Sequence, residues 1–249
     1  ETGAFLVASQ LCSTLPTLNS RLYASSQTFD EARHVEAFTK YLSVRHKGVI
    51  WPFNSNYKDI ITRTLQDERW DIKFVCMQGI IEYYATSVFN TLRQNTADTM
   101  FADMLKLIIR DETRHVAFGR NFLTDYYKTL DNKELDSRAI FLADCLIKLL
   151  DDDYLYHAHL LYEKYNFDPE ETIKHVKDFD NFIIENKRKK FSGIDFDPTI
   201  DHLETFQMTD RFTLMVKSVA VFNDLQLIRP CNIPMLEDAF ELNISEILQ

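Results

Sequence analysis

The sequence predicts an all-α protein: a four-helix bundle made of two helical hairpins, with additional C-terminal helices. Three observations support this fold class. The 249 residues are 45% hydrophobic but include only 5 Gly and 6 Pro, which favours long helices and few tight turns. The pattern Asp-Glu-x-Arg-His occurs twice, at residues 30–34 and 111–115. The glutamate of each copy lies 30 residues after another glutamate, which indicates a repeated structural unit.

The 30-residue spacing is that of a helical hairpin. About a dozen residues, each rising about 1.5 Å, carry the chain away from a point, a short loop turns it, and a similar length brings it back. Two glutamate pairs have this spacing, Glu1 with Glu31 and Glu82 with Glu112. Segments rich in helix-breaking and capping residues mark the two turns, at residues 13–17 and 94–98. The sequence therefore predicts two related hairpins, offset by 81 residues.

The segments outside the hairpins are also expected to be helical in part. Between the hairpins, Gly48, Pro52, Asn54 and Asn56 should end the second helix, and the connection must cross the bundle. Beyond residue 128 the pattern stays helical but has no further Glu-x-x-His. Helices are expected there at residues 133–165, 169–190, 199–225 and 234–247. We treat 1–249 as one domain, with a metal-binding core (1–127) and a C-terminal extension (128–249).

The repeated motif predicts a dinuclear metal site. A Glu and a His three residues apart on a helix point the same way, so each copy offers a carboxylate and an imidazole to one point. Two such pairs and two single glutamates, supplied by four helices, make a site for two metal ions. The six candidate ligands are Glu1, Glu31, His34, Glu82, Glu112 and His115.

The neighbours and chemistry of these residues favour iron or manganese. Apolar residues share their helix faces, so the glutamates face a core, where uncompensated carboxylates are costly and cations are needed. Oxygen-rich ligands with two imidazoles and no thiolate suit iron or manganese better than zinc or copper.

These motifs resemble those of the ferritin-like dinuclear-iron carboxylate proteins, over roughly residues 1 to 127. Within that superfamily the Asp-Glu-x-Arg-His form is similar to the O2-activating branch, the multicomponent monooxygenase hydroxylases and the acyl-carrier-protein desaturases. The resemblance implies that the six residues above are ligands. It also implies an outer layer of residues around them, Asp30, Arg33, Asp111 and Arg114. A metal-bound His needs an acceptor for its other ring N–H, and an Asp beside the ligand of the opposite hairpin can be that acceptor.

The resemblance further implies an oxidase or monooxygenase with two iron ions, or iron and manganese, and with O2 as co-substrate. Such an enzyme needs an electron donor, either a protein or a reductant. Its substrate is expected to be a small, largely apolar organic molecule.

Thr86 lies one turn after Glu82 and on its face. It resembles a threonine that borders the oxygen-binding pocket of the multicomponent monooxygenases, and we predict a catalytic role for it. A helix Thr that bonds the backbone carbonyl four residues back is the alternative. Small and aromatic residues near the ligands predict an apolar substrate pocket, although close helix packing would explain the same residues. The predicted pocket residues are Ala4, Phe5, Ala8, Gln78, Ala85 and Phe89.

Three neighbouring families fit less well. A ribonucleotide reductase radical subunit commonly has Tyr four residues after the first motif His, where this chain has Phe38. The aminobenzoate N-oxygenase type has a third His where this chain has Ile108. A storage ferritin would have to accommodate the C-terminal half in its shell. A ferroxidase or metal-holding protein without an organic substrate, and a radical-generating subunit, remain as alternatives.

The net charge and the cysteines limit the classes of partner and the cellular location that we expect. The formal net charge of −10 counts against nucleic acid as a partner, and no apolar run approaches the length needed to span a membrane. Four cysteines without metal-binding spacing read as reduced thiols, which predicts a cytoplasmic protein. The C-terminal extension can close the bundle, shape a substrate entrance or form the surface of a homodimer. Because the chain begins without Met at a candidate ligand, we expect further residues upstream.

Overall fold

The computed structural model describes residues 1–48, 55–150, 174, 211–240 and 243–248, and every regular element among them is helical. The all-α prediction is therefore confirmed for this part of the chain. The first hairpin consists of α1 (Thr2–Thr14) and α2 (Leu18–His46). In the second hairpin, one continuous helical run is followed by α6 (Thr99–Tyr127). That run comprises α4 (Trp70–Cys76), a π-helical segment η1 (Met77–Ile81) and α5 (Glu82–Asn95).

Both hairpin turns lie where the sequence predicts them, and each has a capping residue that starts the returning helix. The Thr17 side chain accepts a hydrogen bond from the backbone N–H of Ser20, while the Ser20 hydroxyl accepts one from the backbone N–H of Thr17. The Asp98 carboxylate accepts hydrogen bonds from the backbone N–H groups of Met100 and Phe101. These side chains satisfy donors that have no partner inside the helix, so they fix where α2 and α6 begin.

The connection between the hairpins contains a helix that the sequence pattern did not predict. Helix α2 ends at His46, and Lys47 and Gly48 then adopt left-handed backbone angles, with φ of 56° and 70°. Pro52 and Asn54 lie outside the described residues. The sequence predicted that Asn56 helps to end the second helix. This prediction is wrong, because Asn56 lies within α3 (Ser55–Gln66).

Helix α3 lies close against α1. A Cβ placed on Gly3 would lie 2.8 Å from Cδ1 of Ile61, closer than side chains tolerate. The absence of a side chain at Gly3 therefore permits this close packing.

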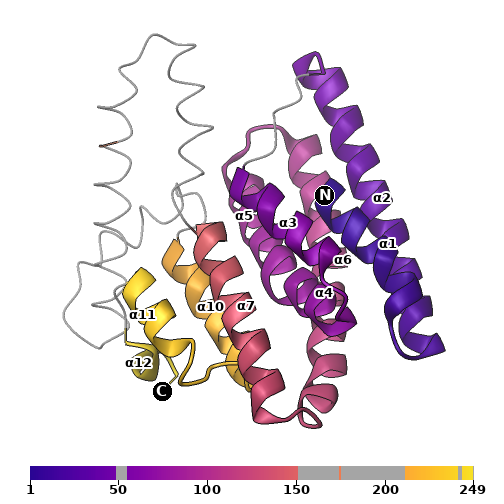
Figure 1. Cartoon of the computed structure of the whole chain (residues 1–249). Helices are drawn as coiled ribbons and strands as arrows, with labels where there is room; N and C mark the ends of the chain where they lie inside the picture. The colour runs from indigo at the N-terminus through magenta and orange to yellow at the C-terminus, as the bar shows by residue number, and fades with distance from the viewer. Residues whose placement is uncertain (49–54, 151–173, 175–210, 241–242, 249) are drawn as a thin grey trace.

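The C-terminal extension packs on the second hairpin and on α3. It contains α7 (Asn132–Leu150), α10 (Arg211–Asp224), α11 (Ile233–Phe240) and α12 (Ile244–Ile247). Figure 1 shows these four helices on the side of the bundle opposite α1 and α2. A buried ion pair between Arg138 and Asp71 joins α7 to α4. One cluster of buried apolar residues includes side chains from α1 at one end of the chain and α12 at the other.

Only part of each predicted C-terminal helix lies among the residues that the structure describes. The helix expected at 133–165 is present up to Leu150, whereas residues 151–165 lie outside the described part. The helix expected at 169–190 also lies outside it, apart from residue 174. The one expected at 199–225 is described from Arg211. The single helix expected at 234–247 is wrong, because Asn243 caps a separate helix by accepting a hydrogen bond from the backbone N–H of Ser245. No described helix is long and apolar enough to cross a membrane.

Candidate metal centre

The six candidate ligands form two overlapping groups inside the bundle. The first group is Glu1, Glu31, His34 and Glu112, and the second is Glu31, Glu82, Glu112 and His115. Within each group, one potential ligand atom from every residue lies within 4.8 Å of those of the others. Glu31 and Glu112 belong to both groups. The geometry therefore offers two neighbouring cation positions that would share these two carboxylates.

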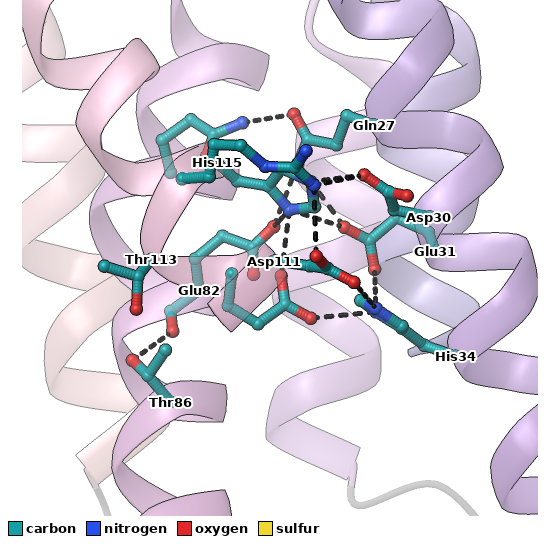
Figure 2. Close-up of polar contacts among 12 residues, drawn as sticks. Gln27, Asp30, Glu31, His34, Glu82, Thr86, Asp111, Thr113 and His115 are labelled. Atoms are coloured by element: carbon teal, nitrogen blue, oxygen red, sulfur yellow. Dashed lines mark hydrogen bonds and ion pairs between the residues drawn. The ribbon is translucent and has the colours of Figure 1, made fainter. Parts of the chain in front are cut away.

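Four helical runs supply these side chains. Glu1 directly precedes α1, Glu31 lies on α2, and Glu112 lies on α6. Glu82 is the first residue of α5, directly after the π-helical segment η1. A π-helical turn takes one residue more than an α-helical turn and often occurs at functional sites. Figure 2 shows Glu31, Glu82 and both histidines converging on one region between the helices.

Each imidazole directs the same nitrogen toward the carboxylates. Nδ1 of His34 lies 2.9 Å from Oε1 of Glu112 and 3.4 Å from Oε2 of Glu1. Nδ1 of His115 lies 2.9 Å from Oε2 of Glu112 and 3.3 Å from Oε1 of Glu31. Nδ1 is thus the ring nitrogen that each histidine can offer to a cation.

The other ring nitrogen of each histidine faces an aspartate of the opposite hairpin. Nε2 of His34 lies 3.5 Å from Oδ2 of Asp111, and Nε2 of His115 lies 3.3 Å from Oδ2 of Asp30. Both aspartates are buried. An ionised carboxylate can only accept a hydrogen bond, so this contact favours the tautomer that carries its proton on Nε2. That tautomer leaves the lone pair of Nδ1 free to bind a cation.

Two arginines complete the outer layer. Nη2 of Arg33 donates to Asp30 at 2.7 Å and to Asp111 at 2.9 Å. Nη2 of Arg114 donates to the same two aspartates, at 2.8 Å and 3.2 Å. Two positive charges therefore balance the two aspartates. The charge of the four glutamates remains to be balanced inside the bundle.

A pair of buried glutamines forms a second contact to the glutamates. Nε2 of Gln27 donates to Oε1 of Glu82 at 2.9 Å and more weakly to Oε1 of Glu31 at 3.4 Å. Nε2 of Gln78 donates to Oε1 of Gln27 at 2.6 Å. Gln27 was missed as a site residue, although an amide one turn before Glu31 on a core-facing stripe was a usable signal.

Gln78, predicted from the sequence to line a substrate pocket, belongs to a hydrogen-bond chain that ends on Glu82. The small residue Gly119 makes room for it. A Cβ on Gly119 would lie 2.5 Å from Cβ of Gln78, so the space beside Gly119 is filled by this side chain.

Without cations, the electrostatics of the cluster are strongly perturbed. Burial, reinforced by Glu112 and Glu31, raises the pKa of Glu82 well above its ordinary value. Burial alone would lower the pKa of His34, but its contacts with the surrounding glutamates outweigh this and raise it to about 12. The same balance raises the pKa of His115 to about 10. Protons would therefore occupy the cluster in place of cations.

Unsatisfied polar atoms mark the same place. Among the described residues, three buried atoms of this cluster have no hydrogen-bond partner: Oε1 of Glu1, Oε2 of Glu31 and Nδ1 of His34. Nδ1 of His34 lies near Glu112 but without hydrogen-bond alignment. Buried polar groups normally have partners, so orphaned ligand atoms in a group of carboxylates and imidazoles fit a cation site. The residues present thus fit two divalent metal ions.

The hydroxyl of Thr86, the predicted catalytic residue, forms a hydrogen bond within its own helix. This hydroxyl donates a hydrogen bond to the backbone carbonyl of Glu82 at 2.6 Å (Figure 2). The backbone carbonyl of Tyr83 lies 3.0 Å from the same hydroxyl. The bond to Glu82 is the bond to the backbone carbonyl four residues back that was the alternative expected from the sequence. A role for Thr86 in chemistry stays a prediction.

The other predicted pocket residues show ordinary helix packing. Ala4 and Ala8 are buried, whereas Phe5, Ala85 and Phe89 are partly buried. The ring of Phe89 packs against Phe38, with 5.4 Å between ring centroids.

A cavity of about 510 Å³ lies elsewhere, along the part of α6 that follows His115. It contains none of the predicted pocket residues. Its walls are Pro16, Trp70, Phe118, Asn121, Phe122, Asp125 and Tyr126. A substrate pocket beside the glutamates therefore also stays a prediction.

No protein-family model, no curated protein and no solved structure matches this chain. The fold and the site themselves define its class: the regular elements of the described residues are all helical, and they enclose a carboxylate and histidine cluster that could hold a metal ion.

Proposed function

We propose that this protein is a ferritin-like dinuclear non-haem metal enzyme, with two iron ions or iron and manganese, that uses O2 to oxidise a small, largely apolar molecule. The observation that carries the proposal is the pair of overlapping ligand groups that share Glu31 and Glu112. Four glutamates and two neutral imidazoles would balance two divalent cations. This oxygen-rich donor set suits iron and manganese.

Each part of the site has a role in this proposal. His34 and His115 would hold one ion each through Nδ1, and Asp111 and Asp30 would keep the opposite ring nitrogen protonated. Burial of Glu31, Glu82 and Glu112 keeps bulk water away from the centre. When bound, two redox-active ions supply the capacity to bind and reduce O2. An electron donor and a homodimeric assembly belong to the same proposal.

Anaerobic loading followed by exposure to O2 tests the function. The metal-free protein is incubated with Fe²⁺, its bound iron is counted, and O2 uptake is recorded with a chemical reductant and a panel of small apolar compounds. We expect two ions per chain and an O2 uptake that increases when one class of compound is present. Fewer than two ions per chain would contradict the dinuclear site. Uptake that no compound changes would contradict the oxygenase.

A ferroxidase or metal-holding protein without an organic substrate is the second candidate. One observation favours it: the Thr86 hydroxyl is bonded to its own backbone. The same experiment separates the two candidates. A ferroxidase would consume O2 in proportion to added Fe²⁺, with no dependence on an organic compound.

A further inference from the structure

We infer that Gln27, held in place by Gln78, is a positioning residue that fixes Glu82 and makes the two metal positions unequal. This inference rests on the proposed dinuclear site. It adds a residue that the ligand motifs do not contain, and it predicts which of the two positions holds its ion more tightly.

The direction of the hydrogen bonds follows from the carboxylate. Glu82, as an ionised ligand, can only accept, so Gln27 must direct its amide NH2 group toward it. Its amide oxygen then points the other way and accepts from Nε2 of Gln78 at 2.6 Å. Gln27 is therefore held at both ends, and its rotamer is not free to change. A ligand carboxylate held by such a partner is oriented before the metal arrives.

The second repeat has no glutamine at the position equivalent to Gln27. The 81-residue offset that relates Glu31 to Glu112 relates Gln27 to Ile108, a buried apolar residue that cannot donate a hydrogen bond. The same offset relates Gly119, which makes room for Gln78, to Phe38. The two glutamines, one from each hairpin, thus form a hydrogen-bond chain to Glu82, and residue 108 offers no such contact to Glu1.

The two unshared glutamates differ accordingly. Oε1 of Glu82 accepts the hydrogen bond from Gln27, and its side chain is 2% exposed. Oε1 of Glu1 has no hydrogen-bond partner, and its side chain is 12% exposed. The position formed with Glu82 and His115 is therefore the preorganised one. We expect it to bind its ion more tightly than the position formed with Glu1 and His34.

Anaerobic titration with Mn²⁺ tests this inference without any measurement of activity. Free Mn²⁺ is followed by its electron paramagnetic resonance signal, which gives the number and affinity of the bound ions. The wild type should bind two ions in two unequal steps. Gln27→Leu should weaken the tighter step by about 10- to 100-fold, as removal of such partners usually does. The matched control is Ile108→Leu at the equivalent position of the other repeat, which should leave both steps unchanged.

A second pair of variants tests the hydrogen bond between Gln27 and Glu82 without changing either residue. Gly119→Ala would place a methyl group against Gln78, so Gln78 must shift and release Gln27. Its tighter step should weaken, though less than in Gln27→Leu. Gly79→Ala is the control, because a Cβ there would have its nearest neighbour at 3.5 Å, an ordinary contact. Thermal unfolding of the metal-free variants shows whether each one folds.

The outcomes separate this inference from the proposed function. If the wild type binds fewer than two ions, both the dinuclear site and this inference are contradicted. If the wild type binds two ions and Gln27→Leu binds them with unchanged affinities, the site stands and the role of Gln27 is overturned. Equal affinities of the two wild-type steps would also overturn it.

Discussion

His34 and Asp111 face each other across the bundle, with 3.5 Å between Nε2 and Oδ2, although they lie 77 residues apart and on different hairpins. The equivalent contact is made by the histidine of the second repeat, because Nε2 of His115 lies 3.3 Å from Oδ2 of Asp30. Each hairpin thus supplies the hydrogen-bond acceptor for the imidazole of the other. Each imidazole therefore has its acceptor only when the two hairpins are packed against each other in this arrangement.

The shared and unshared glutamates should differ in metal stoichiometry. Glu112→Gln keeps the size of the side chain but weakens a carboxylate that both ligand groups use, so we expect loss of both ions. Glu82→Gln affects only one group and should leave about one ion per chain. Equilibrium dialysis with atomic absorption measures both. Two ions retained in Glu112→Gln would refute its shared role.

Removing one outer aspartate should weaken metal binding without touching a ligand. Asp111→Asn loses the charge that holds the Nε2 proton of His34, so the affinity for metal should fall about 10- to 100-fold. Asp103→Asn changes an exposed residue on the same helix and serves as the control. Competition with a chromophoric chelator measures both affinities. Equal affinities of these two variants would show that Asp111 does not orient His34.

The metal-free protein should lose stability as the pH rises above neutrality. Burial opposes it, but contacts with Glu112 and Glu31 raise the pKa of His115 from 6.5 to about 10. A base whose pKa is raised by folding stabilises the fold fully below its unfolded pKa and loses that stabilisation as the pH rises through the folded pKa. The loss should therefore extend from about pH 6.5 to about pH 10.

Urea unfolding of the metal-free protein between pH 6 and pH 10 measures this effect. The midpoint should fall over this range, and it should change less in the metal-loaded protein, where cations replace the protons. A metal-free midpoint that rises toward pH 10 would contradict the assigned protonation of His115.

Thr86 gives a test that separates chemistry from packing. Thr86→Val keeps the shape of the side chain and removes the hydroxyl that donates to the backbone carbonyl of Glu82. If this hydroxyl moves protons during O2 reduction, the variant should release more peroxide per O2 consumed while its metal content stays at two ions. Unchanged peroxide release would leave Thr86 with a packing role only.

The sequence by itself determined the hairpins and the residues that line the site. The spacing of Glu1 and Glu31, and of Glu82 and Glu112, predicted both turns, because helix rise fixes how far a chain travels before it returns. The Glu-x-x-His spacing predicted which side chains share a face, because that depends only on the helical period of one segment. Both are local properties, so a pattern within one chain segment is enough to find them.

The tertiary structure decided what depends on the distance between helices. It showed that Glu31 and Glu112 belong to both ligand groups, and that Nδ1 is the ring nitrogen of each histidine that faces the glutamates. It also showed that Gln78 fills the space beside Gly119 and completes a hydrogen-bond chain to Glu82. Side chains of different helices meet only after packing has set their separation and rotamers, and no periodicity along one helix contains that information.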